Sequence, residues 1–109
     1  MGLSSHVLDT SCGRPAANVE LALMHRENGD FAVLARASTN SDGRARFDAV
    51  HLEKGVYQLT FHTDAYFRSQ GTVGFYPVVH IVFEVTDPTQ HYHVPLLLSP
   101  FGYATYRGS

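Results

Sequence analysis

Three side chains of this 109-residue chain, His6, Arg44 and His93, supply the chemistry needed to hydrolyse a small polar amide or ureide ring. Histidine titrates near neutral pH, so two histidines can divide proton acceptance and proton donation between them. Arginine provides a fixed cationic fork that can hold a carbonyl oxygen or a developing oxyanion. Spacing alone is a weak signal, because a chain with seven histidines can also carry surface histidines beside a solvated Arg44.

The histidines also permit a metal site as an alternative. His91 and His93 are two residues apart, and with His6 they would offer three imidazoles, the ligand set of some catalytic zinc sites. This arrangement requires a facing strand at the right height, and the one cysteine, Cys12, falls in an expected loop. The residues alone leave these alternatives open; hydrolysis by activated water would need no metal and no other cofactor.

The remaining candidates have structural explanations. Asp9 is expected to form a turn at the end of a strand, and Cys12 has no neighbouring base in the sequence that would make it a nucleophile. Four histidines show no partner pattern and are expected to be exposed or hydrogen-bonded: His25, His51, His62 and His80. Four aromatic residues are expected to pack a helix onto a sheet: Tyr66, Phe67, Phe75 and Tyr76.

The elements that must position the reactive groups begin with the stretch from His91 to Ser109. Alternate side chains of an extended strand share a face. One face of this stretch is apolar and is expected to meet the core: Tyr92, Val94, Leu96 and Leu98. The other face mixes titratable and apolar side chains, which indicates a second buried surface such as a subunit interface or a ligand cleft: His91, His93, Pro95 and Leu97. Residues 3–9 repeat this pattern, with His6 beside Leu8 on the non-core face.

The rest of the chain consists of short strands separated by turns. Alternation and turn residues predict strands at 19–25, 31–38, 44–47, 55–62 and 78–85, followed by a final pair broken at Ser99–Pro100. Residues 63–71 fit one or two turns of helix, with Thr63 or Asp64 capping its start and Gly71 ending it in the left-handed conformation. Seven or eight strands and at most one small helix predict an all-β fold, an antiparallel β-sandwich.

Composition limits the possible classes of protein. The length predicts one domain, residues 1–109, and 44% hydrophobic with 17% charged residues indicates a globular chain. A net charge of −2 and scattered basic residues exclude a nucleic-acid footprint. No apolar stretch reaches membrane-spanning length, no signal sequence is recognisable, and one cysteine cannot form a disulfide within the chain. A cytoplasmic protein is therefore expected.

Five motifs together resemble a known family. They are Ser5–Thr10, Gly13-x-Pro15-Ala16, Thr39–Arg44, His91–Pro100 and the terminal Tyr-Arg-Gly-Ser of Tyr106–Ser109. In this order they span essentially the whole chain, which is similar to the 5-hydroxyisourate hydrolases, the transthyretin-related enzymes of urate breakdown. The hormone-carrying transthyretins lack the histidines and the terminal Tyr-Arg-Gly-Ser, so the resemblance is to the enzymes.

This resemblance implies a transthyretin-like sandwich of two four-stranded sheets, with one short helix after the fifth strand. It implies a homotetramer, a dimer of dimers, whose active sites line a channel at the dimer–dimer interface. The residues that match catalytic positions are His6, Arg44 and His93. Those that match a substrate-binding C-terminal motif are Tyr106, Arg107, Gly108 and Ser109. Leu8, Pro95 and Leu97 are implied to face the channel, with His91 at its rim.

The implied reaction is hydrolysis of 5-hydroxyisourate to 2-oxo-4-hydroxy-4-carboxy-5-ureidoimidazoline, in which water opens the six-membered ring. The implied partners are this small molecule and further copies of the chain, with no nucleic acid and no membrane. Ala104 stands where the family usually has serine, on the channel side, and it leaves the three principal groups unchanged. One alternative is a transthyretin-like carrier without turnover, although an apolar ligand would have to desolvate histidines and Arg44. Another is a monomeric structural sandwich.

Overall fold

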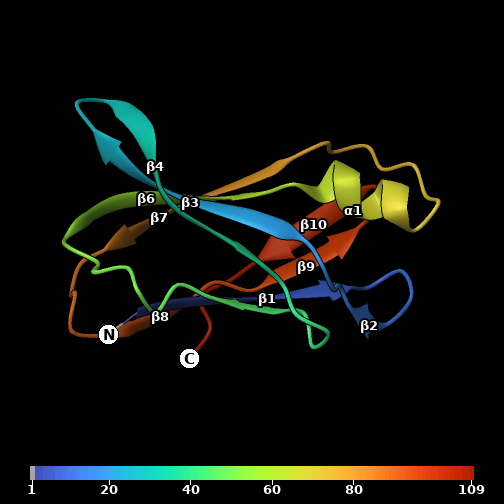
Figure 1. Ribbon diagram of the computed structural model, residues 1–109, viewed down its shortest axis with the longest axis horizontal. Helices are drawn as coiled ribbons and strands as arrows, with labels where there is room; N and C mark the ends of the chain where they lie inside the picture. The colour runs from blue at the N-terminus through green and yellow to red at the C-terminus, as the bar shows by residue number, and fades with distance from the viewer. Residues whose placement is uncertain (1) are drawn as a thin grey trace.

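A computed structural model of the chain describes residues 2–109 as two stacked β-sheets with one short helix at one end (Figure 1). The strands in chain order are β1 (Gly2–Asp9), β2 (Arg14–Pro15), β3 (Glu20–Glu27), β4 (Asp30–Ser38), β5 (Arg44–Arg46), β6 (Gly55–Phe61), β7 (Val79–Val85), β8 (His91–His93), β9 (Leu96–Ser99) and β10 (Gly102–Thr105). The helix α1 spans Thr63–Ser69, between β6 and β7.

One sheet has four antiparallel strands in the order β4-β3-β6-β7. Its β3–β4 hairpin turns at Asn28 and Gly29, whose φ angles of 51° and 86° lie in the left-handed region that an Asn-Gly pair adopts readily. Tyr57, Leu59 and Phe61 of β6 point inward and are buried, as their alternation predicts.

The other sheet is built around β1, and six strand segments occupy four positions in it. β2 and β5 lie along one edge of β1, β8 and β9 lie along the other, and β10 follows β9. Pro95 separates β8 from β9, since proline has no N–H to donate to a ladder. The predicted all-β sandwich is confirmed, with one refinement: β1 runs parallel to β8 and β9, so this sheet is mixed.

The core between the sheets fixes which face of the β1 sheet points outward. Leu3, Val7, Leu96 and Leu98 are at most 1% exposed, and burying a leucine contributes about 1.5–3 kcal/mol. A slip of one residue would move these side chains to the opposite face, so their burial holds the strand register. The predicted inner face of the 91–98 stretch is confirmed. Pro95 is already buried within the single chain, where the Thr105 hydroxyl donates to its carbonyl oxygen at 2.7 Å, whereas Leu97 is half-buried.

The helix is shorter than expected and begins differently. It starts after His62, and among residues 2–109 no side chain caps its start; the Thr63 hydroxyl instead donates to the Tyr76 carbonyl at 2.8 Å. Gly71 is left-handed, with φ 69°, as predicted. Tyr66 is buried and donates its hydroxyl proton to Asp9 at 2.7 Å.

The aromatic cluster is divided between the core and the surface. Tyr66 and Phe67 are buried, as expected for helix packing, but Phe75 and Tyr76 are exposed, which corrects their assignment to the core. Tyr76 instead packs edge-on against Phe75 and Tyr103 at the surface, with ring centres 5.0 and 5.2 Å apart. Within residues 2–109, no helix is long and apolar enough to cross a membrane.

Candidate active site

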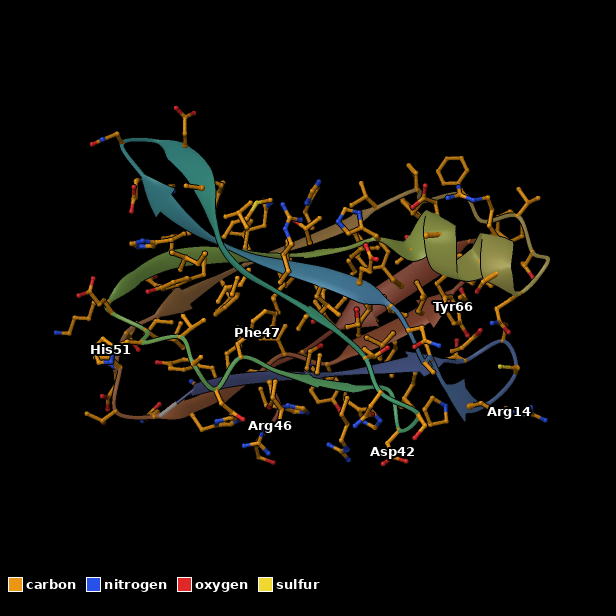
Figure 2. All side chains as sticks on the ribbon, in the orientation of Figure 1. Arg14, Asp42, Arg46, Phe47, His51 and Tyr66 are labelled. Carbon is orange, nitrogen blue, oxygen red and sulfur yellow. The ribbon has the colours of Figure 1, made fainter. Side chains whose placement is uncertain are left out.

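The three predicted catalytic residues come from three adjacent strands of the β1 sheet. His6 of β1 is the cross-strand partner of Arg44 of β5, and Ser4 pairs with His93 of β8 on the other side. Cross-strand partners share a face, so His6, Arg44 and His93 lie on the same face of the sheet. This is the outer face, because the alternate residues Ser5, Ala45 and Tyr92 are buried. Figure 2 shows the same alternation at the end of β5, where Arg46 points away from the sandwich and the next residue, Phe47, points into it.

A tight turn before β5 holds Arg44 in place. The Asn40 side-chain oxygen accepts hydrogen bonds from the backbone N–H groups of Asp42 and Arg44, at 2.9 and 3.0 Å. Gly43 has φ 75°, and a Cβ added there would collide with the Val7 carbonyl oxygen. The Val7 N–H in turn donates to the Gly43 carbonyl at 2.7 Å. The turn is therefore bonded directly to β1.

The same turn orients His6. Its Nε2 lies 2.9 Å from the Asp42 carbonyl oxygen, which can only accept a hydrogen bond. Nε2 must therefore carry a proton, and in the neutral ring Nδ1 is left as the acceptor. His6 is half-buried, so its ring remains accessible from the outer face. One backbone carbonyl thus selects the tautomer of this histidine.

His93 is held in its neutral form. Burial, followed by the nearby charges of Arg44, His6 and His91, lowers its pKa from the ordinary value of 6.5, while a hydrogen bond to Ser4 acts in the opposite direction. Its Nδ1 lies 2.7 Å from the Ser4 hydroxyl oxygen, which leaves Nε2 for other partners. When Nδ1–H donates to Ser4, Nε2 of the neutral ring has a free lone pair, as a general base requires.

His91 lies beside this group but is exposed to solvent. Its Nε2 is 2.9 Å from the same Ser4 hydroxyl. The metal alternative required His6, His91 and His93 to converge. Across the described residues 2–109, no group of three His, Cys, Asp or Glu side chains has the geometry to hold a metal ion.

The C-terminal motif reaches the site through Gly108. Its backbone N–H donates to the His93 carbonyl at 2.8 Å, forming an isolated antiparallel bridge. A Cβ at Gly108 would overlap the His93 ring, so only glycine allows the tail to lie this close. Ser109, which follows, is exposed, and Tyr106 is 58% exposed.

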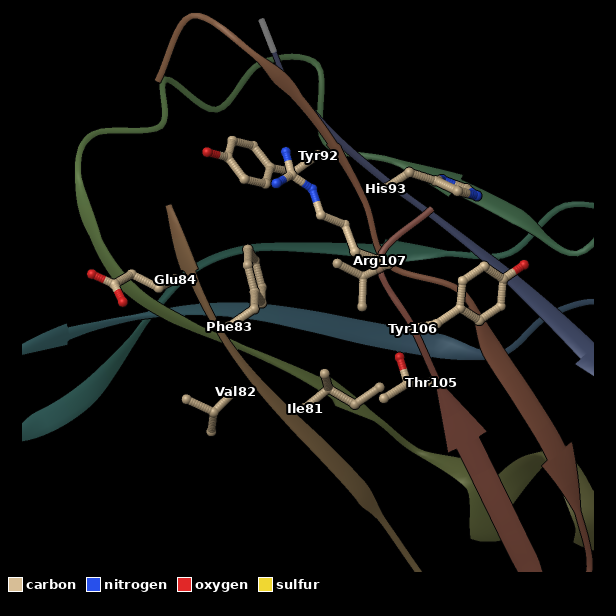
Figure 3. Close-up of a pocket in the computed structure, with 10 residues that line it drawn as sticks. Ile81, Val82, Phe83, Glu84, Tyr92, His93, Thr105, Tyr106 and Arg107 are labelled. Atoms are coloured by element: carbon tan, nitrogen blue, oxygen red, sulfur yellow. The ribbon is translucent and has the colours of Figure 1, made fainter. Parts of the chain in front are cut away.

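Arg107 points in a different direction in the single chain. Its guanidinium lies 4.7 Å from the centre of the Tyr92 ring and donates to the Gln90 side-chain oxygen at 2.9 Å. Figure 3 shows this guanidinium against Tyr92, while the His93 ring points away on the other side of the strand.

A pocket of about 230 Å³ lies between β7 and the tail, lined among others by Phe83, Tyr92 and Arg107. Among residues 2–109, those that line this pocket include His93 but not His6 or Arg44. His93 therefore borders both the pocket and the outer face, whereas His6 and Arg44 lie on the outer face alone.

The structure also identifies residues that sequence reasoning missed. Ser4 contacts both His91 and His93, and Asn40 builds the turn that positions Arg44 and His6. Ser4 precedes His6 by two residues on the same strand face, so the alternation rule could have placed it in the site. Asn40 gave a turn signal, but its specific partners depend on loop geometry. Cys12 is exposed and Asp9 binds Ser11 and Tyr66, as structural residues do.

Comparison with known proteins shows the same family throughout the chain. Residues 3–108 match the model of the HIUase/Transthyretin family. A 5-hydroxyisourate hydrolase from Halalkalibacterium halodurans is 44% identical, with 98% of this chain and 97% of that protein covered.

Two solved structures show that the fold is shared by enzymes and carriers. The 5-hydroxyisourate hydrolase of Klebsiella pneumoniae superposes with a TM-score of 0.87 at 40% identity, covering all of both chains. Sea bream transthyretin, solved in complex with thyroxine, also has a TM-score of 0.87, at 31% identity over 97% of this chain and 93% of that one. On the sequence match and the fold together, the chain belongs to the HIUase/Transthyretin family.

Proposed function

We propose that this chain is a 5-hydroxyisourate hydrolase, which converts 5-hydroxyisourate to 2-oxo-4-hydroxy-4-carboxy-5-ureidoimidazoline by opening the six-membered ring. The observation that carries this proposal is the outer face of the β1 sheet, where His6, Arg44 and a neutral His93 lie on adjacent strands. Relatives 40–44% identical over nearly the whole chain bear this enzyme's name. A carrier would have no use for a neutral base beside a cation.

In the proposed mechanism His93 accepts a proton from water at Nε2, in the tautomer whose Nδ1–H donates to the Ser4 hydroxyl. The hydroxide adds to the ring carbonyl carbon, and Arg44 stabilises the negative charge that develops on its oxygen. Removing one such donor typically costs about 2.7–4 kcal/mol of transition-state stabilisation. His6 orients the water and assists protonation of the leaving nitrogen as the carbon–nitrogen bond breaks.

The terminal motif is proposed to bind the substrate. Gly108 brings the tail against His93, so Ser109 follows directly beside the site. Tyr106 is exposed and available for contact. Arg107 would take part from its position over Tyr92 by rotating its side chain, because its contacts there are a single hydrogen bond and a ring face. These four residues remain assigned as substrate-binding.

Association of four copies is proposed to enclose the open site. The edge strands β7 and β10 carry backbone groups that can pair with another sheet edge. Several large hydrophobic side chains are more than 40% exposed in the single chain, as expected of a subunit surface: Val82, Phe75, Phe101 and Tyr103. We propose a homotetramer, a dimer of dimers, acting through residues 1–109 as a single domain. A cytoplasmic setting suits the free thiol of Cys12.

The test is turnover of freshly generated 5-hydroxyisourate, followed spectroscopically, by wild type and by His6→Ala, Arg44→Ala and His93→Ala. Each substitution is expected to lower kcat/KM by about 10²–10³-fold. Full activity in any two variants would overturn the site. Tight binding of thyroxine without turnover would support a carrier instead, and loss of activity with a chelator would support a metal enzyme. Gel filtration distinguishes a tetramer from a monomer.

A further inference from the structure

Ser4 connects two histidines through one hydroxyl group. Its Oγ lies 2.7 Å from Nδ1 of His93 and 2.9 Å from Nε2 of His91. The backbone fixes this arrangement, because β1 and β8 pair Ser4 with His93, and the Val94 N–H donates to the Ser4 carbonyl at 3.0 Å. His93 is half-buried and His91 is exposed, so the three residues lead from the site to solvent.

The hydroxyl has one proton, so its two hydrogen bonds must run in the same direction. In the first arrangement Nδ1–H of His93 donates to Ser4, and the Ser4 hydroxyl donates to Nε2 of His91. In the second, Nε2–H of His91 donates to Ser4, and the hydroxyl donates to Nδ1 of His93. The first leaves Nε2 of His93 as a base and the second makes it a donor. The tautomers of the two neutral rings are therefore linked: both carry the proton on Nδ1, or both carry it on Nε2.

We propose that His93, Ser4 and His91 form a proton relay that carries a proton from the site to solvent. A proton arrives on Nε2 of His93, the Nδ1 proton passes to Ser4 Oγ, and the hydroxyl proton passes to Nε2 of His91. No other bond changes, and the net result is one proton moved from the first ring to the second. Ser4 is the positioning residue of this relay and His91 is its outlet.

The proposed reaction requires such a path, and the relay rests on that proposed function. Hydrolysis of a cyclic amide places one proton of water on the leaving nitrogen, and the new carboxylic acid releases one proton near neutral pH. One proton per turnover must therefore leave the site. Repeated protonation of His93 would be unfavourable if that proton stayed on its ring.

The charges around the relay favour transfer outward. His6 of β1 and Arg44 of β5 face His93 from the neighbouring strands, and they oppose a positive charge on its ring. Asp48 is paired with Arg46 of β5, with 3.1 Å from Nε to the carboxylate, so these two charges offset each other. His91 is the exposed member of the three, and it can pass a proton on to solvent.

The first experiment measures the rings directly and does not depend on activity. In ¹⁵N-histidine NMR of the wild-type protein, the neutral rings of His91 and His93 are expected to show the same tautomer, and protonation of His91 is expected to change the Nδ1 signal of His93. In Ser4→Ala this linkage is expected to disappear, whereas Ser4→Thr, which keeps a hydroxyl, retains it. Independent rings in wild type would overturn the relay.

The second experiment measures its use in turnover. His91→Gln keeps a hydrogen-bonding side chain but cannot take up a proton; we expect kcat to fall about tenfold in dilute non-nucleophilic buffer and to recover as imidazole buffer is added. In Ser4→Ala we expect kcat to fall further than in His91→Gln, with a shifted pH profile of kcat and little change in KM. The exposed loop histidine variant His51→Gln serves as the control and should match wild type.

The two proposals fail in different ways. Linked rings with no turnover in wild type would reject the hydrolase and leave the relay standing. Turnover in His91→Gln at the wild-type rate, independent of buffer concentration, would reject the relay while the hydrolase remains.

Discussion

Two segments approach the outer face of the β1 sheet, and they are held very differently. The turn from Asn40 to Arg44 is bonded to itself and to β1 through backbone and side-chain hydrogen bonds. The terminal motif of residues 106–109 is tied to the site by one backbone bond, from Gly108 to His93. We infer that the turn side supplies the fixed reactive geometry, while the tail side supplies adjustable contacts.

This difference follows from what each segment must do. Charge stabilisation depends on groups that are already oriented before the reaction, so Arg44 and the tautomer of His6 require a rigid support. Substrate entry and release require a segment that can open at low cost, and few contacts give a low local stability. Substitutions at matched glycines separate the two roles.

The largest effect is expected from Gly43→Ala. Alanine at φ 75° is strained, and its Cβ would strike the Val7 carbonyl oxygen, so the turn must move away from β1. We expect the free energy of unfolding to fall by about 3 kcal/mol or more, with loss of activity, as measured by urea denaturation and turnover.

Gly13→Ala is the matched control for this prediction. Gly13 has a similar φ of 68°, but a Cβ there meets no atom within 4 Å. We expect Gly13→Ala to lower the free energy of unfolding by about 1 kcal/mol, through backbone strain alone. Equal losses in the two variants would show that contact with β1 does not hold the turn.

Gly108→Ala tests the tail, and we expect it to change activity much more than stability. The new Cβ would overlap the His93 ring, so the tail must shift or the ring must turn. We expect kcat/KM to fall about 10–100-fold, while the free energy of unfolding changes by less than about 1 kcal/mol, because the segment contributes little to the core. Gly102→Ala, whose Cβ would make an ordinary 3.8 Å contact, is the control. A large loss of stability in Gly108→Ala would contradict the view of an adjustable tail.

Asn40→Ala should weaken the turn without breaking it. The substitution removes the acceptor for the N–H groups of Asp42 and Arg44, which are exposed enough to bind water instead. We expect a loss of about 1–2 kcal/mol in unfolding free energy, measured by urea denaturation, and a smaller effect on kcat than Arg44→Ala. Asn40→Asp, which retains the acceptor oxygen, should recover most of the loss.

The sequence predicted most of the buried and outward faces of the β1 sheet. Alternation in β1 and β8–β9 predicted the buried and outward faces, because burial of Leu96 and Leu98 outweighs other preferences. Pro95 interrupts the ladder between β8 and β9, and its burial in the single chain was not predicted. Its environment depends on tertiary packing that no local pattern carries.

The sequence predicted three site residues that the fold places on one face, but it did not predict the groups that hold them there. Residue type and resemblance identified His6, Arg44 and His93, whereas the tautomer of His6 depends on the Asp42 carbonyl and that of His93 on Ser4. Such partners are 36 and 89 residues apart in sequence, so only the fold brings them together. The predicted cap of α1 was wrong for a similar reason. The Thr63 hydroxyl donates to the distant Tyr76 carbonyl and does not accept from the first N–H groups of the helix.

The smallest expected effect concerns the charge of His93 and its dependence on pH. Burial and then Arg44 lower the pKa of His93 from 6.5, so the acid limb of kcat/KM should lie below 6.5, where the ring gains a proton and loses its lone pair. Since the unfolded chain binds this proton more tightly, stability should fall as pH drops from 6.5 through the lowered pKa. His93→Gln should remove that part of the slope in urea denaturation between about pH 5 and 8.

Arg44→Gln should move the pKa of His93 back towards its ordinary value, as followed by NMR titration of its ring, because a neighbouring positive charge is removed. Arg36→Gln, on the four-stranded sheet, is the control and should leave the titration unchanged. An unchanged pKa in Arg44→Gln would mean that burial and the neighbouring histidines, without Arg44, keep His93 neutral. The turn would then contribute geometry to the site without tuning the base on the neighbouring strand.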